Sequence, residues 1–424
     1  MPNIWLPYTQ MLNAPPPLKV ASASGSEITL EDGRVLVDAI GSWWTSCHGY
    51  QHPKLVAAIK QQADTLSHVM LGGLIHHPLI EFTQKLCSQL PADLQHVNFA
   101  ESGSVAVEIA MKIAYQYWLN QNQKRHRMIH LKQGYHGDTF LAMSVCDPEE
   151  GMHTQLGDLL PHQICIELPN TESDFDALDT LLSQRHQEIA AFIVEPLVQG
   201  AGGMRFLEAS LLRRTCELMR AYQLPVIFDE IFTGFGRTGT LFAFEQVDFV
   251  PDLLCLGKGI TGGMTPFAAT IAHTTLYNAF LSQQPDKALM HASTFAGHAL
   301  GAAVGIASLE LFEDSRWQSN VSRIEKQLKQ ELAPCQGLPA VVDVRALGAI
   351  GVVEMAFSLA PVQQHLIEDL LSQGIWCRPF GNIIYTTPSF NIKADQLSHI
   401  TQAICNSVER IASQWHDQLG RTNG

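Results

Sequence analysis

The stretch LPVIFDE, residues 224–230, is a short apolar run that ends in two acidic residues. Three runs of the same kind stand elsewhere in the chain: HVNFA (96–100), AAFIVEP (190–196) and DLLCLGK (252–258). Short, continuously apolar runs are typical of strands that are buried on both faces, as in parallel sheets. Helical patterns with an apolar stripe separate these runs, for example from Ser104 onward. This alternation predicts an α/β fold.

The two ends of the chain carry a different pattern. Residues 28–39 (ITLEDGRVLVDA) indicate a hairpin that turns at Asp32-Gly33. The C-terminal part combines a charged helical segment (322–333), a strand-like segment (341–355) and a closing helix from Ala394 to Trp415. We therefore expect a large domain with a mostly parallel central sheet flanked by helices, and a smaller α+β domain built from both chain ends. The expected bounds are 51–312 for the large domain, and 1–50 together with 313–424 for the small one.

The composition favours an intracellular oligomer. Charged residues make up 16% of the 424 residues, below the roughly 25% of ordinary soluble domains, so a partner subunit is expected to cover part of the surface. The formal net charge of −14 argues against a nucleic-acid partner. The nine cysteines form no C-x-x-C pair, which indicates reduced thiols and no zinc site. Because neither a signal-peptide pattern nor an apolar run of about 18 residues is visible, we expect a soluble, cytoplasmic protein.

Asp229 and Lys258 each stand at the end of an apolar run. At the carboxyl end of a parallel strand, a side chain faces the crevice where α/β proteins bind their ligands. A buried carboxylate there needs a cationic partner. A desolvated lysine loses its proton readily and can then attack a carbonyl group. The pair therefore indicates a ligand that carries both a cationic group and a carbonyl group.

The segment Glu101-Ser-Gly-Ser104 lies between the run HVNFA and the next helix. Backbone amides and hydroxyls at the start of a helix suit a phosphate group. Taken one by one, this segment, Asp229 and Lys258 each fit an ordinary structural role. Taken together, an aldehyde for the lysine, a protonated ring nitrogen for the aspartate and a phosphate for the helix describe pyridoxal 5′-phosphate, which we expect as the cofactor.

Three other motifs are rejected. Residues 234–239 match G-x-G-x-x-G, but the following segment is aromatic and contains Pro251, whereas a dinucleotide site would open a long helix there. His48 and His52 have the spacing of helix-borne metal ligands, yet Gly49 lies between them, so packing or turn roles are expected and no metal site is predicted. The chain contains no G-x-S-x-G motif, which weakens a serine-hydrolase interpretation.

The run FDEIFTGFGRTG (228–239), followed by LGKGITGG (256–263), resembles the signature of class III pyridoxal-phosphate aminotransferases of fold type I. Further segments along almost the whole chain resemble the branch of this class that acts in biotin biosynthesis. They are GSWWTSCHGYQHP (41–53), HVMLGG (68–73), SGSVAVEIAMK (102–112), GYHGDTFLAMSVCDP (134–148), VQGAGGMR (198–205) and RPFGNIIY (378–385). The resemblance implies that the amino group of S-adenosylmethionine is moved onto 8-amino-7-oxononanoate. It also implies a homodimer with active sites at the subunit interface.

The resemblance implies roles for several residues around the cofactor. Lys258 would bind the cofactor aldehyde, Asp229 would pair with the ring nitrogen, and Tyr135 would stack on the ring. The phosphate would be held by Gly103, Ser104, Ser293 and Thr294, the last from the neighbouring subunit. The supporting positions would be Asp138, Glu195 and Arg237.

For the substrate, the resemblance implies an apolar wall and two polar contacts. Trp43 and Trp44 would line the nonanoate chain, although plain core packing would also account for this pair. Tyr8 would face the substrate amine. Arg378 would bind the far carboxylate, because a guanidinium group pairs with a carboxylate through two hydrogen bonds. The remaining substrate-binding positions would be Tyr135 and Ala292.

The segment HASTF (291–295) departs from the class, where HGPTF is usual. Ala292 and Ser293 thus replace a Gly-Pro pair beside the expected cofactor phosphate.

Two alternatives to this expected function stay open. One is a different class III ω-aminotransferase with another amino donor, such as lysine, or another acceptor. The other is a non-catalytic protein that only binds the cofactor, and the retained lysine, aspartate and phosphate loop argue against it.

Overall fold

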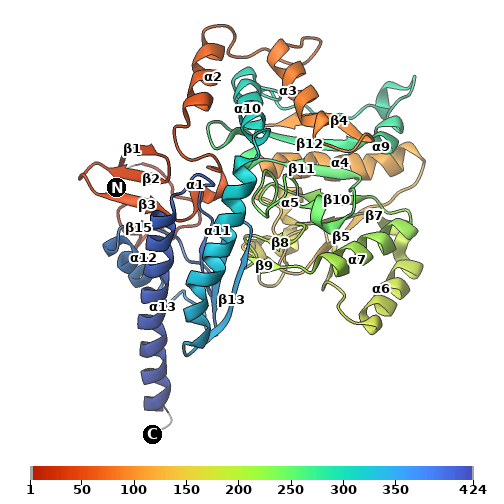
Figure 1. Cartoon of the computed structure of the whole chain (residues 1–424). Helices are drawn as coiled ribbons and strands as arrows, with labels where there is room; N and C mark the ends of the chain where they lie inside the picture. Colours follow the sequence, from red (N-terminus) through yellow and green to blue (C-terminus); the bar gives the residue numbers. More distant parts are fainter. Residues whose placement is uncertain (1–2, 423–424) are drawn as a thin grey trace.

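A seven-stranded sheet forms the centre of the molecule (Figure 1). The computed structural model describes residues 3–422, with side chains as far as Ser413. The sheet runs in the order β4 (Leu94–Ala100), β12 (Ala268–His273), β11 (Leu253–Leu256), β10 (Val226–Asp229), β7 (Ile189–Val194), β5 (Arg127–Leu131) and β6 (Ile164–Ile166). Only β12 is reversed among these strands, since it pairs antiparallel with both β4 and β11. The predicted α/β fold with a mostly parallel sheet is confirmed.

Helices cover both faces of this sheet. The longest of them, α4 (Gly103–Asn120), packs across β12, β11 and β7. The other helices of this part are α2 (Pro53–Ala63), α3 (His77–Ser88), α6 (Glu172–Arg185), α7 (Ala209–Ala221) and α10 (Ala299–Phe312), with the short helices α5 (Phe140–Met143), α8 (Phe244–Val247) and α9 (Thr274–Asn278). A two-stranded ribbon of β8 (Val198–Gln199) and β9 (Arg205–Phe206) adjoins the sheet.

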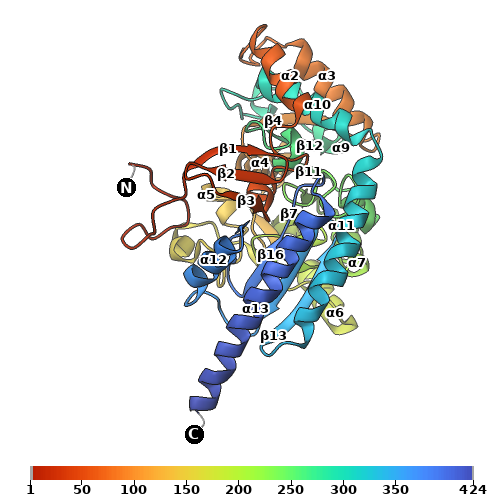
Figure 2. The ribbon, with the colours of Figure 1, turned by 60° about the vertical axis from the view of Figure 1, so that its left-hand side comes forward.

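The two ends of the chain meet in a second sheet, as Figure 2 shows beside α12 and α13. It consists of β1 (Val20–Ser24), β2 (Glu27–Leu30), β3 (Val35–Asp38) and β15 (Ile375–Trp376). The predicted hairpin is the antiparallel pair of β2 and β3, and the C-terminal strand β15 pairs with β3 in parallel. The remaining elements are β13 (Val341–Leu347), β14 (Ile350–Met355), β16 (Ile383–Thr386), α11 (Arg316–Leu332), α12 (Gln363–Ser372) and α13 (Ala394–Thr422).

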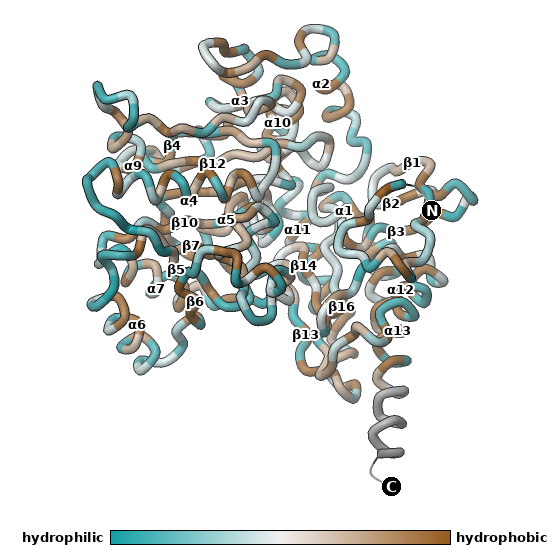
Figure 3. Tube along the Cα trace, turned by 180° about the vertical axis from the view of Figure 1, so that it is seen from behind, coloured by the Kyte–Doolittle hydropathy of each residue, from teal (hydrophilic) through white to brown (hydrophobic). Residues whose placement is uncertain are grey.

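Alternating side chains of the central strands point into two hydrophobic clusters. Ile227 of β10 belongs to the cluster under α4, whereas Val226 and Phe228 belong to the larger cluster on the other face. The strands are accordingly apolar at consecutive positions, and the tube in Figure 3 carries hydrophobic colours through this region. Because both faces of the sheet are covered, only the ends of its strands remain open to a ligand. No helix among residues 3–422 is long and apolar enough to cross a membrane.

Candidate active site

The carboxyl ends of five strands converge on one cavity of about 210 Å³. Asp229 is the last residue of β10. Lys258 comes two residues after the end of the adjacent strand β11 and opens a short 3-10 helix, η3 (Lys258–Thr261), so it does not end the strand itself as predicted from the sequence. The cavity is lined by Trp44, Gly103, Ser104, Tyr135, His136, Gly137, Glu195, Asp229, Ile231, Phe232 and Lys258.

Lys258 is held in a setting that favours the neutral amine. Its backbone has φ 41°, a left-handed conformation that is uncommon for a residue with a side chain. Burial lowers the pKa of the ammonium below its ordinary value, although the carboxylates of Asp229 and Glu195 act in the opposite direction. Nζ lies 4.7 Å from the centre of the Trp44 ring. A neutral amine in this position can attack a carbonyl carbon and can accept a proton.

Asp229 is fixed from two sides. Oδ2 lies 2.8 Å from Nδ1 of His136, and Oδ1 accepts a hydrogen bond from the backbone N–H of Ile231 at 3.1 Å. Both Asp229 and His136 are buried, with 4% and 2% of their surfaces exposed. His136 has no role in the sequence prediction, although it stands next to Tyr135 in the segment GYHGD. A buried carboxylate held in this way can keep a cationic ring nitrogen protonated.

The start of α4 forms another part of the cavity wall. The helix begins at Gly103, and Ser102 caps it by accepting a hydrogen bond from the backbone N–H of Val105. The first N–H groups of a helix have no partner within the helix and attract anions. A side chain at position 103 would come within 2.9 Å of Ile231, so only glycine fits there. Ser104 Oγ accepts a hydrogen bond from the backbone N–H of Asp138 at 3.1 Å, which joins this wall to the segment after β5.

A group of hydroxyls and one carboxylate lies beside the cavity. Asp138 Oδ1 accepts hydrogen bonds from the hydroxyls of Tyr8 at 2.6 Å and Tyr135 at 2.9 Å. Burial raises the pKa of Tyr8 to about 12 and raises the pKa of Tyr135 as well, so both hydroxyls stay protonated at neutral pH. His153 also approaches this carboxylate, with Nε2 3.1 Å from Oδ1. No motif in the sequence pointed to His153, which follows Asp138 in the chain beyond α5.

The two tryptophans lie on an unusual turn. Residues 41–44, labelled α1 in Figure 1, all have positive φ between 50° and 74°. Such a conformation costs roughly 1–2 kcal/mol for each residue with a side chain, and strain of this kind is typical of functional sites. Trp44 is buried against Phe232 with ring centres 4.3 Å apart, whereas Trp43 is 40% exposed. Plain core packing therefore accounts for Trp44 better than for Trp43.

Trp43 lies near two of the other predicted substrate residues. Its ring lies 6.3 Å from that of Tyr8 and 5.6 Å from the guanidinium carbon of Arg378. Tyr8 comes from the N-terminal segment and Arg378 from the segment after β15. The structure thus brings together residues from both ends of the chain next to the residues of the central sheet.

Two predicted supporting residues are buried. Glu195, directly after β7, accepts hydrogen bonds from the backbone N–H groups of Tyr135 and Gly200, and burial raises its pKa to about 7. Arg237 donates from Nη1 to the carbonyls of Ala349 and Pro388. Glu195 lines the cavity but Arg237 does not, so Arg237 ties the central part of the chain to the C-terminal part.

The segment 292–294 holds three of the predicted site residues. Ala292 and Thr294 are exposed and Ser293 is partly exposed, in the segment that precedes α10. None of the three lines the cavity. Of these residues, Thr294 is the one expected to act from a neighbouring subunit, which stays a prediction.

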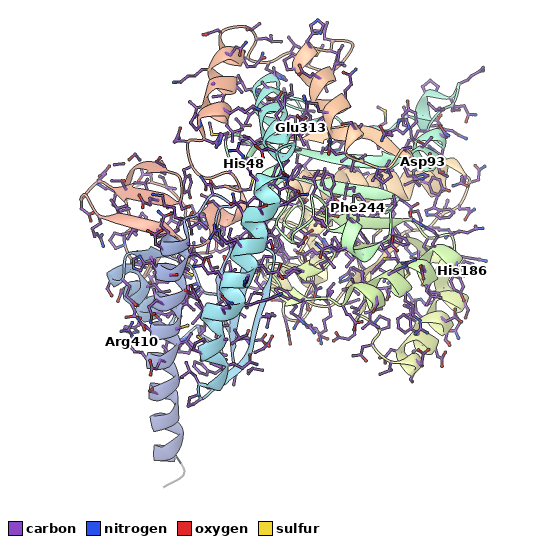
Figure 4. The ribbon with its side chains drawn as sticks, viewed as in Figure 1. His48, Asp93, His186, Phe244, Glu313 and Arg410 are labelled. Carbon is purple, nitrogen blue, oxygen red and sulfur yellow. The ribbon has the colours of Figure 1, made fainter. Side chains whose placement is uncertain are left out.

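The rejected motifs behave as ordinary structural elements. His48 is buried with Nε2 3.0 Å from Ser308 Oγ (Figure 4), and His52 caps α2 by accepting a hydrogen bond from the backbone N–H of Lys54. The G-x-G-x-x-G segment is followed by the four-residue helix α8, which contains Phe244, and not by a long helix.

The cavity fits pyridoxal phosphate on the chemistry of its walls. It offers an amine for an aldehyde at Lys258 and a carboxylate for a ring nitrogen at Asp229. The N-terminus of α4 offers backbone N–H groups for a phosphate. The close contact between Gly103 and Ile231 keeps side chains out of the space beside this helix start.

Comparison with known proteins agrees with this chemistry. A family model described as aminotransferase class-III matches residues 9–408. The adenosylmethionine-8-amino-7-oxononanoate aminotransferase of Corynebacterium glutamicum is 42% identical over 416 residues, which cover 96% of this chain and 97% of that protein. The protein of the same description from Mycobacterium leprae is 40% identical over 414 residues, which cover 95% of this chain and 94% of that protein.

Solved structures give the same result. The crystal structure of an adenosylmethionine-8-amino-7-oxononanoate aminotransferase from Methanocaldococcus jannaschii superposes with a TM-score of 0.91 at 32% identity, covering 96% of this chain and 97% of that one. An amine transaminase from an uncultivated Pseudomonas species, in its PLP-bound form, has a TM-score of 0.89 at 27% identity and covers 96% of this chain and 98% of that one. This chain therefore belongs to the class III aminotransferases and is a pyridoxal-phosphate-dependent transaminase.

Proposed function

We propose that this chain transfers the amino group of S-adenosylmethionine to 8-amino-7-oxononanoate and so forms 7,8-diaminononanoate, a step of biotin biosynthesis. The observation that carries the proposal is the convergence of Lys258 and Asp229 in one buried cavity, next to a cluster of Tyr8, Trp43 and Arg378. Support also comes from the names of relatives that match nearly the whole chain.

Lys258 is the residue that moves protons. Pyridoxal phosphate, when bound, supplies an aldehyde that takes up and returns an amino group, and a ring that withdraws electrons from the reacting carbon. Nζ of Lys258 would bind the cofactor aldehyde at rest. With a substrate bound, Nζ would take a proton from the substrate carbon that bears the amino group and would later return one to the acceptor carbon. Burial lowers the pKa of Lys258, which favours the neutral amine that accepts this proton.

The other cavity residues hold the cofactor in place. Asp229 keeps a ring nitrogen protonated because a nearby anion favours the charged form, and His136 orients Asp229. Gly103 and Ser104 bind the phosphate at the start of α4. Tyr135, whose hydroxyl donates to Asp138, would stack on the cofactor ring.

The substrate occupies the space beside Trp43. Its apolar chain lies along Trp43 and Trp44, and its carboxylate pairs with the guanidinium group of Arg378. The amine faces the hydroxyl of Tyr8, whose proton is directed to Asp138. This arrangement would select a long ω-carboxylated substrate over a short one.

The active enzyme is a homodimer in this proposal. Exposed apolar side chains stand near the segment 292–294 and in the segment before α3. They are Met70, Leu74, Ile75, Met290 and Phe295. A second copy would cover them and would bring Ser293 and Thr294 to the cofactor phosphate and Ala292 to the substrate.

The replacement of Lys258 by Ala tests the first part of the proposal. The variant should bind pyridoxal phosphate without forming an adduct that borohydride reduces, and it should not turn over. The wild-type adduct should be reduced and stay covalently attached to the peptide that contains Lys258. A Lys258→Ala variant with substantial activity would contradict the assignment.

A different class III ω-aminotransferase is the second candidate. It is favoured by the Ala292-Ser293 pair in place of Gly-Pro, and by the fold similarity to an amine transaminase. The two candidates differ in their substrates. Purified enzyme should form 7,8-diaminononanoate from 8-amino-7-oxononanoate with S-adenosylmethionine as donor, and the gene should restore growth without biotin to a strain that lacks this step. Turnover only with lysine or simple amines would favour the second candidate.

A further inference from the structure

Two cysteines that are 70 residues apart in the chain lie in direct contact. Cys335 Sγ donates a hydrogen bond to Cys405 Sγ, with 3.0 Å between the two sulfurs. Cys335 belongs to a short 3-10 helix, η5 (Ala333–Gly337), that follows α11, and Cys405 lies on α13. Neither residue lines the active-site cavity. No other thiol–thiol hydrogen bond is found within the part of the chain that the structure describes.

The two thiols differ in access and in acidity. Cys335 is fully buried, whereas Cys405 is partly exposed. The hydrogen bond from Cys335 lowers the pKa of Cys405 and raises the pKa of Cys335. Since the thiolate is the reactive form of cysteine, Cys405 is the one that meets an oxidant first. Cys335 then stands within reach as the second thiol.

The surrounding framework already holds the two backbone segments together. Thr401 and Ser398 of α13 donate hydrogen bonds to the carboxylate of Glu331, at the end of α11. On its other side α13 is tied to Asp369 of α12 by Arg410 (Figure 4), with 2.9 Å between the charged groups. The sulfurs need to approach by only about 1 Å to reach bonding distance.

We propose that Cys335 and Cys405 form an intramolecular disulfide when the folded protein meets a low-molecular-weight disulfide such as oxidised glutathione. The Cys405 thiolate attacks one sulfur of the reagent, the reagent's S–S bond breaks, and a glutathione thiolate leaves. Cys335 then loses its proton to solvent and attacks Cys405 Sγ, and the second glutathione thiolate leaves. The protein loses two protons and two electrons, and the reagent gains them as two thiols.

The disulfide would link α13 to the end of α11 covalently. A bond that closes a loop of 70 residues restricts the unfolded chain more than a short loop would. We therefore expect the oxidised protein to unfold at a temperature several degrees higher than the reduced protein. This modification is independent of the proposed substrate.

The experiment is incubation of the native, cofactor-loaded enzyme with oxidised glutathione, followed by alkylation of free thiols and peptide mapping. The expected product is a peptide pair that joins Cys335 to Cys405 and lacks two hydrogens. Cys87 and Cys165 serve as internal controls because they are also partly exposed. Because burial raises the pKa of both thiols, they should react little with the reagent and should form no protein–protein link.

Two variants separate the steps of the reaction. In Cys335→Ser, Cys405 should stop at the mixed disulfide, and in Cys405→Ser, Cys335 should stay a free thiol. Both should lose the rise in unfolding temperature and keep the wild-type activity. A wild-type protein that keeps both thiols free, or that accumulates Cys405 as a mixed disulfide, would overturn the proposal. The wild-type map decides the question even if a variant fails to fold.

Discussion

His136 Nδ1 lies 2.8 Å from Asp229 Oδ2, so a buried imidazole holds the carboxylate that faces the cavity. The replacement Asp229→Asn removes the negative charge next to the expected ring nitrogen and should lower kcat by several orders of magnitude, with the fold retained. His136→Leu leaves the charge but removes its partner. A hydrogen bond to a charged group contributes about 1.5–3 kcal/mol, so we expect kcat to fall about tenfold to a hundredfold.

Single-turnover absorbance changes with the amino donor would measure both effects. The same variants should still bind the cofactor covalently at Lys258. This would show that a low rate comes from a slow reaction and not from the loss of the cofactor site. Near-normal turnover of Asp229→Asn would refute its role at the ring nitrogen. If the double variant His136→Leu/Asp229→Asn showed the sum of the two single losses in activation free energy, His136 would act in its own right and not through Asp229.

Tyr8 and Asp138 form the next coupled pair, with 2.6 Å between hydroxyl and carboxylate. Tyr8→Phe should raise KM for the amine-bearing substrates about tenfold and change kcat less, because the hydroxyl contacts the amine and not the reacting carbon. Asp138→Asn should raise KM more than Tyr8→Phe does, since the same carboxylate oxygen also accepts a hydrogen bond from Tyr135. The double variant should resemble Asp138→Asn alone, because both changes remove one interaction. Additive losses in steady-state kinetics would show that the two residues act separately.

Arg378 should determine the preference for a free carboxylate. We expect the wild-type enzyme to prefer 8-amino-7-oxononanoate over its methyl ester, and Arg378→Ala to lose most of this preference in kcat/KM. The acid-to-ester ratio of kcat/KM for Arg378→Lys should lie between those of the wild type and Arg378→Ala, because a lysine keeps the charge but not the bidentate geometry. Arg410→Ala, remote from the cavity, is the matched control. An unchanged acid-to-ester ratio in Arg378→Ala would exclude this contact.

Strands of the central sheet could be predicted from the sequence because they are buried on both faces. Runs such as VIF before Asp229 have no polar position, and a short run of this kind is typical of a strand in the interior of a sheet. The same logic placed Asp229 correctly at the end of β10, whereas Lys258 follows the end of β11 by two residues and does not end it. The reversed strand β12 was not predicted, because an apolar run carries no information about its direction. The division of the chain at residues 50 and 312 stays a prediction.

Other features depend on contacts that a local pattern does not contain. The left-handed turn at residues 41–44 is held by packing of Trp44 on Phe232, far along the chain. His153 reaches Asp138 across an irregular segment. Thr294 illustrates a different limit, since its expected partner lies on a second copy of the chain. The role of Thr294 at the cofactor phosphate was inferred from the family resemblance, because contacts within one chain do not indicate it.

Glu230, next to Asp229, gives a prediction for stability against pH. Its carboxylate is fully buried and accepts hydrogen bonds from the backbone N–H groups of Ala243 and Phe244. Burial raises its pKa from 4.5 to about 8. Between these two values the folded protein keeps a proton that the unfolded chain has released. The contribution of Glu230 to stability therefore falls as pH rises through this window, by up to about 1.4 kcal/mol per pH unit.

Glu230→Gln stays neutral and should lack this pH dependence. Urea unfolding of the cofactor-free protein should be measured between pH 5 and 8. The free energy of unfolding of the variant should increase relative to that of the wild type as pH rises, within the window set by the folded pKa of about 8. At the acidic end the variant should be the less stable of the two, because an amide accepts only one of the two backbone hydrogen bonds well. Glu409→Gln, on the exposed side of α13, is the control and should follow the wild-type curve. A constant difference between Glu230→Gln and wild type across this range would mean that Glu230 titrates at its ordinary pKa despite its burial.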